Sequence, residues 1–226
     1  METFQRIEKK YLLSEEQYRS FSEKIEPYVR EDRYHLTGIR SLYYDTKTFQ
    51  LIRRSIEKPE YKEKLRVRSY GDAQAEDKVF VELKKKFDGI VYKRRTKAIC
   101  EEVMKDLRTC TFKDPQVGKE IRYFLDYYPD LRPMIYIGCE RISYVGKEDE
   151  KLRITFDRNI CYRMKDLSLH SSNLNKKLTD STVMELKIAG AMPLWLSGIL
   201  DEVKAYPRGF SKVGTAFLKE VEGVRS

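Results

Sequence analysis

The 226-residue chain has a formal net charge of +9, with 36% charged and 41% hydrophobic residues; this favours a single domain over residues 1–226 with a buried core, and an anionic partner such as a nucleic acid, a membrane surface or a polyphosphate. Its four cysteines form no CxxC pair and it has two histidines, so a zinc site is not expected and the thiols are interpreted as free in a reducing cytosol. The charged N-terminus has no apolar signal region, and the most apolar stretch, 186–200, is short and interrupted by Gly and Pro, so we expect a cytoplasmic protein without a transmembrane segment.

Strict alternation of apolar and polar residues predicts several β-strands. In residues 152–157 every second side chain is apolar, so one face of the strand is apolar and the other polar. The same pattern recurs at 6–12, 65–68, 79–86 and 184–188. The dipeptide Asp88-Gly89 follows one of these runs and precedes another β-like run, and such a dipeptide is typical of a hairpin turn.

Helix-start signals lie between these strands. Ser14 opens a capping box, which predicts a helix to about Pro27. Asp114 and Pro115 predict the cap and the first residue of a second helix, and Pro193 predicts the start of a third. A shorter helix is predicted near 100–107. Antiparallel strands with a few covering helices define an α+β class.

The polar faces of the predicted strands are rich in cations. Residues i and i+2 of a strand point the same way, so side chains separated by two positions reach the same space. Such pairs are Arg66 with Arg68, Lys84 with Lys86, and Lys93 with Arg95. The acids on the same faces are few, namely Glu8, Glu82, Asp157 and Glu185.

Two interpretations of these faces remain open. The simpler one is an ordinary sheet with its apolar face on a core and its charged face in water. However, like charges on neighbouring strands repel each other, and surface sheets usually mix both signs. The alternative is a sheet closed into a barrel, with the cations inside around an anion and helices covering the exterior. Arginine binds phosphate oxygens in pairs, and the scattered carboxylates suit Mg²⁺ or Mn²⁺.

Several segments, in order along almost the whole chain, resemble the VTC polyphosphate polymerase domain. This domain belongs to the triphosphate tunnel metalloenzymes, which are relatives of the CYTH proteins. A single such segment would be a weak signal, whereas the ordered set is a strong one. The matching segments are RIEKKY (6–11), SLYYDT (41–46), KLRVRSYG (64–71), VFVELK (79–84) followed by GIVYKRR (89–95), VMELK (183–187) and FSK (210–212).

The resemblance implies an eight-stranded antiparallel β-barrel tunnel with a charged interior and helices packed outside. It also implies a metal cofactor, Mn²⁺ or Mg²⁺, and a phosphate-chain substrate. The catalytic or substrate-binding cations carried over by position are Lys10, Arg66, Arg68, Lys84, Lys93, Arg141 and Arg153. Further substrate contacts are expected at Arg95, Lys187, Ser211 and Lys212. Glu185 matches the metal-binding glutamate, and Glu8 and Glu82 are the secondary candidates for a metal-binding or positioning role.

The sequence departs from the related families at two positions. CYTH triphosphatases open with ExExK, whereas this chain has Arg6 in place of the first acid, before Glu8 and Lys10. Losing one carboxylate weakens a hydrolase interpretation and fits the VTC branch. Cys139 stands where the polymerases can have a tyrosine, two residues before Arg141. The eukaryotic relatives carry a regulatory SPX domain and membrane helices, so export of polyphosphate by this chain would need a separate membrane partner.

Three functions follow as hypotheses. The first is a metal-dependent polymerase that transfers the ATP γ-phosphate to a growing inorganic polyphosphate chain. The second is a triphosphatase or polyphosphatase on the same scaffold. The third is a binding module for polyphosphate or a nucleic-acid backbone, which should show steep salt dependence. We expect ATP and polyphosphate, and no nucleic acid, as partners, because a duplex cannot thread a barrel of this size. The sequence does not set the oligomeric state.

Overall fold

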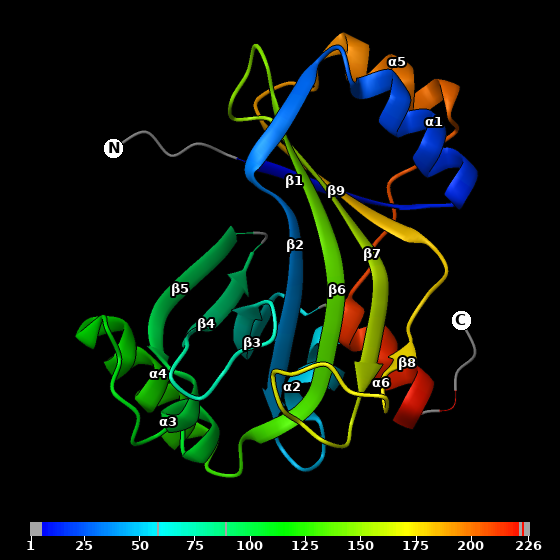
Figure 1. The fold of residues 1–226 in the computed structure, drawn as a ribbon. Coiled ribbons are helices and arrows are strands. Elements are labelled where there is room, and N and C mark those ends of the chain that lie inside the picture. Colours follow the sequence, from blue (N-terminus) through cyan, green and yellow to red (C-terminus); the bar gives the residue numbers. More distant parts are fainter. Residues whose placement is uncertain (1–5, 58, 89, 222, 224–226) are drawn as a thin grey trace. The chain divides into compact units, whose positions relative to one another are not determined.

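The computed structural model describes residues 6–57, 59–88, 90–221 and 223, which form a mixed α+β structure (Figure 1). The strands are β1 (Arg6–Leu13), β2 (Val29–Asp45), β3 (Tyr61–Tyr70), β4 (Lys78–Phe87), β5 (Ile90–Ile99), β6 (Arg132–Gly146), β7 (Arg153–Arg163), β8 (Lys176–Lys177) and β9 (Thr182–Ala189). The helices are α1 (Glu15–Ile25), α2 (Gln50–Ile56), α3 (Cys100–Lys105), α4 (Pro115–Tyr127), α5 (Leu194–Glu202) and α6 (Lys212–Val221). In this part of the chain, no helix combines the length and the apolar character that a bilayer crossing requires.

The strands form one large sheet in the order β1-β9-β7-β6-β2-β3-β4-β5, with β8 paired to β7. The ladders β1–β9, β7–β9, β2–β3, β3–β4 and β4–β5 are antiparallel. The predicted α+β class with an antiparallel sheet is therefore confirmed. Within the described residues, β1 and β5 end the strand order without pairing to each other, so the closed barrel stays a prediction.

The chain divides into two compact units whose segments alternate along the sequence. The first unit contains Met1–Thr37, Cys139–Ile160 and Thr179–Ser211, and the second contains Gly38–Gly138, Cys161–Leu178 and Lys212–Ser226. Three of the five boundaries fall inside β2, β6 and β7, so these strands contribute to both units. Each unit has its own hydrophobic core, and the single-domain expectation stays a prediction.

The core of the first unit confirms the predicted alternation. Ile154 and Phe156 of β7 pair with Leu186 and Met184 of β9, and all four side chains are fully buried. Burying each large aliphatic or aromatic side chain contributes about 1.5–3 kcal/mol. Helix α1 begins with the predicted capping box at Ser14, and α1 and α5 lie side by side (Figure 1).

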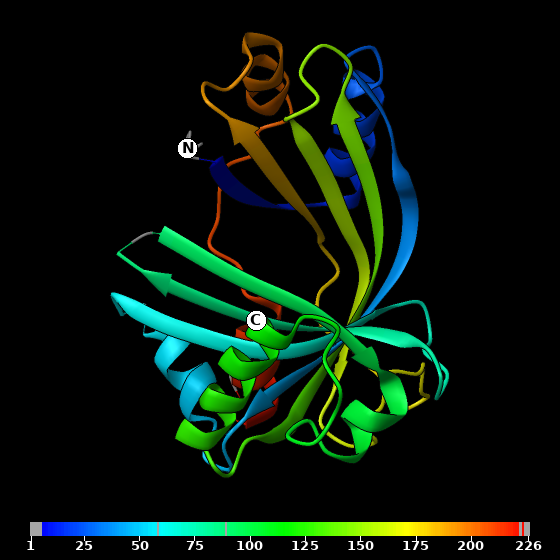
Figure 2. The same ribbon diagram turned by 90° about the vertical axis from the view of Figure 1, so that its left-hand side faces the viewer.

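The core of the second unit lies on one face of β3, β4 and β5. Leu65 and Val67 of β3 pack with Val79, Val81 and Leu83 of β4, and these residues are almost completely buried. Helices α3 and α4 lie along the same strands (Figure 2). Asp114 accepts hydrogen bonds from the amides of Gln116 and Val117, which confirms the predicted start of α4. The opposite face of these strands is left to charged side chains.

Helix α2 was not predicted, because its signal is a carboxylate several residues before the helix. Asp45 is buried at the end of β2 and accepts hydrogen bonds from the amides of Thr46, Leu51 and Ile52. The hydroxyl of Thr46 accepts another from the amide of Gln50. These contacts satisfy amides at the start of the helix that would otherwise have no partner. The DT pair of the SLYYDT segment therefore has a structural role.

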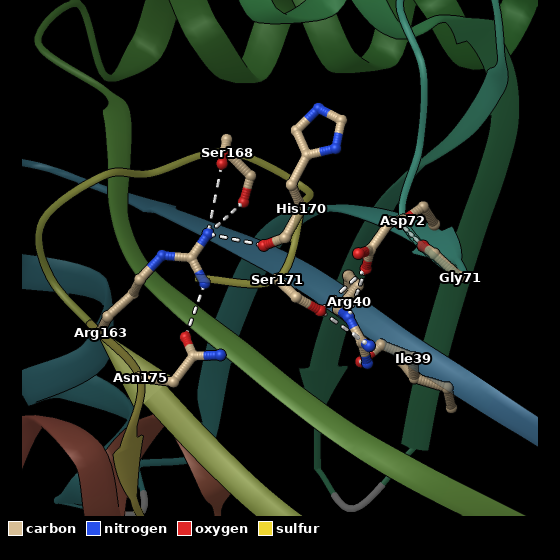
Figure 3. Close-up of polar contacts among 10 residues, drawn as sticks. Ile39, Arg40, Gly71, Asp72, Arg163, Ser168, His170, Ser171 and Asn175 are labelled. Atoms are coloured by element: carbon tan, nitrogen blue, oxygen red, sulfur yellow. Dashed lines mark hydrogen bonds and ion pairs between the residues drawn. The ribbon is translucent and has the colours of Figure 1, made fainter. Parts of the chain in front are cut away.

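A buried arginine organises the loop between β7 and β8 (Figure 3). The guanidinium of Arg163 is 3.6 Å from the ring centroid of Tyr136. It donates hydrogen bonds to the carbonyls of Asp166, Ser168 and His170 and to the side chain of Asn175. Since an unpaired buried charge is costly, these acceptors fix the course of the loop.

The same loop is tied to the turn between β3 and β4 through an exposed polar network (Figure 3). Arg40 donates from Nε to Asp72 at 3.0 Å and from a terminal nitrogen to Ser171 at 3.2 Å. Ser171 in turn contacts Asp72 at 3.2 Å. This network belongs to the scaffold of the second unit and uses none of the predicted site residues.

Candidate functional site

A basic strand face occupies the side of β3, β4 and β5 opposite the core. In register, Arg66 of β3 stands beside Glu82 of β4, which stands beside Arg95 of β5. The neighbouring rows place Lys64, Lys84 and Lys93 together, and Arg68, Phe80 and Lys97 together. Directly paired residues of antiparallel strands point to the same side, so one acid lies among many cations on this face.

The centre of this face is Glu82, whose side chain is 1% exposed. Four cationic side chains approach its carboxylate, at 2.6 Å for Arg66 Nε, 2.7 Å for Lys93 Nζ, 3.4 Å for Arg95 Nε and 3.9 Å for Arg68 Nε. We call these five residues the Glu82 cluster. One carboxylate does not neutralise four cations, so the cluster itself carries surplus positive charge.

The surplus charge perturbs the acids around it. Burial by itself raises the pKa of Glu82, but Arg66, Arg68 and Lys93 outweigh this effect and lower that pKa to about 2. The phenol of Tyr43 accepts a hydrogen bond of 3.1 Å from Arg66. Burial raises the pKa of Tyr43, yet the nearby charges of Arg66, Arg68 and Lys64 bring it down to about 8. A positive potential strong enough to shift a phenol in this way also attracts anions.

Two aromatic side chains border the Glu82 cluster. The guanidinium of Arg95 is 3.6 Å from the centroid of the Phe80 ring, and it donates a hydrogen bond of 3.0 Å to the hydroxyl of Tyr70. The rings of Tyr70 and Phe80 meet edge to face at 5.5 Å. These contacts hold the Arg95 side chain in one orientation and reduce the entropy that it would lose on binding an anion.

A second charged face lies on β1 and β9 in the first unit. In register, Glu8 stands opposite Lys187, and Lys10 stands opposite Glu185. Lys187 Nζ is 2.8 Å from the carboxylate of Glu185, while Lys10 Nζ is 3.9 Å from Glu185 and 4.0 Å from Glu8. We call these four residues the Glu185 cluster. It alternates two acids with two cations, so its charges balance.

The surroundings of Glu185 keep it ionised. Burial raises the pKa of Glu185, but Lys187, Lys10 and Arg141 together hold that pKa well below its usual value. Arg141 itself forms a two-point ion pair with the buried Asp157, at 2.6 and 2.7 Å. A guanidinium held by a buried carboxylate in this way has a fixed position. From this fixed position, the positive charge of Arg141 lowers the pKa of Glu185.

The oxygen atoms of this face fit a magnesium or manganese ion. Glu8 and Glu185 supply carboxylates, and Thr155 stands opposite Glu185 in the β7–β9 ladder. The Thr155 hydroxyl is buried and has no hydrogen-bond partner within the described structure. In that same part of the chain, no three or more His, Cys, Asp or Glu side chains are grouped to hold a metal. Because Mg²⁺ is often bound by one or two carboxylates together with water and substrate phosphates, this set suits a metal shared with a phosphate.

The remaining predicted residues lie at other places. Lys84 is exposed and stands between Lys64 and Lys93 in the strand register. Arg153 forms an ion pair of 2.6 Å with Asp32 and stands opposite Lys187 in register. Ser211 directly precedes α6, and Lys212 is its first residue. The Gly89 position of the predicted hairpin turn lies outside the described residues. The roles of all these residues stay predictions.

Sequence reasoning overlooked several residues that shape the site. Ser41 and Tyr43 share one face of β2 and stand opposite Arg68 and Arg66, so the same i, i+2 rule could have found Tyr43. Asp157 was noted as an acid, but its pairing with Arg141 depends on side-chain geometry. Alternation placed Thr155 on the polar face of its strand, but its role and that of Asp32 depend on neighbours distant in the chain.

The fold and these two faces define an α+β protein with a strongly cationic strand surface suited to polyanions. A family profile described as the VTC domain matches residues 5–219. The chain belongs to the VTC domain family, which confirms the resemblance seen in the sequence. A search of curated proteins found no match.

Solved structures share the fold at low sequence identity. One, from Bacillus halodurans and provisionally named an adenylate cyclase, has a TM-score of 0.57 and 16% identity, and covers 91% of this chain and 93% of its own. Another, from Vibrio parahaemolyticus and provisionally named in the same way, has a TM-score of 0.50 and 11% identity, and covers 96% of this chain and 99% of its own. At such identities the likeness concerns the fold alone.

Proposed function

We propose that this protein is a polyphosphate polymerase that transfers the γ-phosphate of ATP to a growing inorganic polyphosphate chain. The observation that carries the proposal is the Glu82 cluster, in which four cations within 4 Å share one buried carboxylate. A phosphate chain supplies the missing negative charge, and membership of the VTC domain family supports this substrate class.

In this proposal the Glu82 cluster holds phosphate oxygens. Arg66, Arg68 and Arg95 offer N–H donors in a planar fork that matches two oxygens of a phosphate, and Lys93 adds a point charge. Glu82 is better placed as the counter-ion that orients these cations than as a metal ligand, since four cations would repel a divalent ion. Its metal-binding role, predicted from the resemblance, stays a prediction.

In this proposal the metal binds to the charged face of β1 and β9, at the Glu185 cluster. Glu185 and Glu8 would hold Mn²⁺ or Mg²⁺ together with phosphate oxygens of the substrate. When bound, the ion would neutralise charge on those phosphates and draw electron density from the phosphorus that is attacked. Arg141 and Lys187 keep Glu185 deprotonated and available as an oxygen ligand.

No nucleophile from the protein is needed for the transfer. A terminal oxygen of the polyphosphate chain attacks the γ-phosphorus of ATP, the bond to the β-phosphate oxygen breaks, and ADP leaves. Catalysis by positioning and charge neutralisation is sufficient for such a transfer. The finer fold prediction, an eight-stranded tunnel with a charged interior and helices outside, belongs to this proposal.

Incubation of the purified protein with ATP and Mn²⁺, followed by sizing of the phosphate products on a gel, tests the proposal. A polymerase produces a ladder of lengthening chains and ADP in equal amounts to the phosphates added. Release of orthophosphate without chain growth would instead identify a triphosphatase or polyphosphatase. Binding of polyphosphate without turnover would identify a binding module.

A further inference from the structure

An exposed aromatic and apolar surface lies at the free end of the β4–β5 hairpin and on the adjoining helix. Phe87, Ile90 and Tyr92 are 49%, 56% and 51% exposed, and Tyr123 and Tyr127 of α4 are 72% and 68% exposed. We call these five residues the hairpin patch. Large apolar side chains scattered singly on a surface need no explanation, but a contiguous group does.

The three hairpin residues lie on one face of the sheet. Phe87 is paired with Ile90 and with Tyr61, and Tyr92 is paired with Lys85. Leu83, Lys85 and Phe87 are spaced by two positions along β4 and therefore lie on one face. Leu83 is buried, so this is the face that carries the core. The patch is thus a continuation of the apolar face of β4 and β5 to the end of the hairpin.

Helix α4 brings its tyrosines to the same end. The backbone amide of Lys113 bonds to the Lys97 carbonyl, and Glu120 pairs with Arg94 at 3.0 Å. Increasing residue numbers along α4 therefore correspond to decreasing numbers along β5, so α4 runs toward the turn, and Figure 2 shows the helix alongside these strands. Tyr123 and Tyr127 are four residues apart and lie on one side of the helix.

Hydrogen bonds and ring contacts connect the helix to the hairpin at this end. The hydroxyls of Tyr61 and Tyr128 both donate to the buried carboxylate of Glu63, at 2.5 and 2.8 Å. The ring of Tyr127 contacts that of Tyr128 at 4.8 Å between centroids, and Tyr61 is the strand partner of Phe87. The helix tyrosines and the hairpin residues therefore belong to one surface.

Positive charge lies beside the patch, at Lys85 and Arg94, and on the opposite face of the same hairpin. The hairpin segment 84–95 carries one acid, Asp88, and its cations are Lys84, Lys85, Lys86, Lys93, Arg94 and Arg95. Arg54 of α2 adds a guanidinium 5.9 Å from the Tyr61 ring. Tyrosine and phenylalanine combined with lysine and arginine is the composition that favours the boundary between lipid headgroups and acyl chains.

We propose that the hairpin patch docks this protein on an anionic membrane surface. Lys85 and Arg94 share the face of the patch and attract acidic headgroups, and Phe87, Ile90 and Tyr92 enter the interfacial layer beneath them. Charge complementarity selects this occupant, because Lys85, Arg94 and Arg54 border the apolar side chains and a neutral apolar groove on a protein offers no negative charge to them. The interaction is peripheral and does not depend on the proposed enzyme activity.

Sedimentation of the full chain with vesicles tests this inference. Vesicles of phosphatidylcholine with about 30% phosphatidylserine should bind the protein, phosphatidylcholine alone should bind it at least tenfold more weakly, and raising the salt concentration should weaken binding to the acidic vesicles. The double substitution Ile90→Ser with Tyr92→Ser should reduce binding to the acidic vesicles at least tenfold. These two side chains are exposed, so the variant should keep the melting temperature of the wild type.

A matched control uses exposed residues elsewhere. Tyr34 and Leu36 on β2 are 67% and 72% exposed, and Tyr34→Ser with Leu36→Ser should leave vesicle binding unchanged. Equal losses in both double variants, or wild-type binding by the hairpin variant, would overturn the inference. So would a wild-type dimer that the hairpin variant converts to a monomer, because the patch would then be a contact between copies.

A second measurement reports on insertion. The chain has a single tryptophan, Trp195, in the first unit. In the variant Tyr92→Trp, brominated acyl chains should quench fluorescence in excess of the quenching seen for the wild type. Quenching no greater than that of Trp195 alone would show that the hairpin does not enter the lipid layer.

Discussion

The two charged clusters are built on the same kind of strand face but differ in their balance of charge. The carboxylate of Glu82 is almost completely buried and meets four cations. Glu185 is 15% exposed, meets Lys187 and Lys10, and shares its face with a second acid, Glu8. The first arrangement attracts an anion, whereas the second provides oxygen atoms that a divalent cation prefers.

This difference shows that a carboxylate surrounded by cations can have either of two roles. In the Glu82 cluster the acid keeps like charges close enough to bind one ligand. In the Glu185 cluster the cations keep the acid deprotonated, and the acid is the group that would bind. Substitutions in the Glu82 cluster should therefore mainly affect stability and phosphate transfer. Substitutions in the Glu185 cluster should mainly affect metal dependence.

The largest effect is expected from Glu82→Ala. Removing the acid leaves four cations in mutual repulsion with no compensating charge, and losing one partner of a buried ion pair typically costs about 3–5 kcal/mol. Urea unfolding should show this loss, and saturating tripolyphosphate should restore part of it. Glu120→Ala is the control, because its partly exposed pair with Arg94 contributes about 0–1 kcal/mol. Equal losses in the two variants would contradict the account.

Arg66→Ala should reduce the rate of phosphate transfer by about a hundredfold or more, since removing one preorganised charge contact can cost ~3 kcal/mol of transition-state stabilisation. The measurement is steady-state formation of polyphosphate from ATP. Arg94 lies on the same sheet but on the core side, paired with Glu120, so Arg94→Ala should keep activity within a few-fold. An Arg66→Ala enzyme as active as the wild type would remove this residue from the site.

The sequence predicted the strand faces of both clusters and much less of what lies around them. Alternation located Arg66, Glu82 and Arg95 because side-chain direction in a strand follows from position alone. It could not pair Arg153 with Asp32, since that contact joins strands whose register depends on the whole sheet. Nor could it distinguish Arg163, whose partners are mainly backbone carbonyls of a loop.

The helices show the same limit. Those with a cap next to their first residue, α1 and α4, were predicted from Ser14 and Asp114. Helix α2 begins after Phe49, which has a left-handed backbone conformation, and is capped from the more distant Asp45. Such a cap cannot be recognised from the residues next to the helix. Helix α6 was not predicted either.

A smaller effect is expected from Glu185→Gln. The amide keeps the size of the side chain but removes the charge that a divalent ion requires. The Mn²⁺ concentration for half-maximal activity should rise at least about tenfold, which corresponds to ~1.4 kcal/mol. Tripolyphosphate binding without metal should not weaken, because the variant loses a negative charge. An unchanged metal requirement would place the ion elsewhere.

The smallest effect is a spectroscopic one. Ultraviolet absorbance should detect a tyrosine that ionises near pH 8, because the cations around Tyr43 lower its pKa from the ordinary value of 10.0 to about 8. Tyr43→Phe should abolish this transition. Tripolyphosphate should move the transition to higher pH, since an added anion opposes formation of the phenolate. A transition insensitive to the ligand would mean that the anion binds away from Arg66.

Calorimetric titration with tripolyphosphate in metal-free buffer tests the central claim most directly, because it compares the two clusters with one ligand. Arg66→Ala should weaken binding at least tenfold. The charge-neutral pair Glu185→Gln with Lys187→Gln should leave the affinity within a few-fold of the wild type. Unchanged affinity in Arg66→Ala, together with lost affinity in the double variant, would contradict the assignment of the anion to the Glu82 cluster.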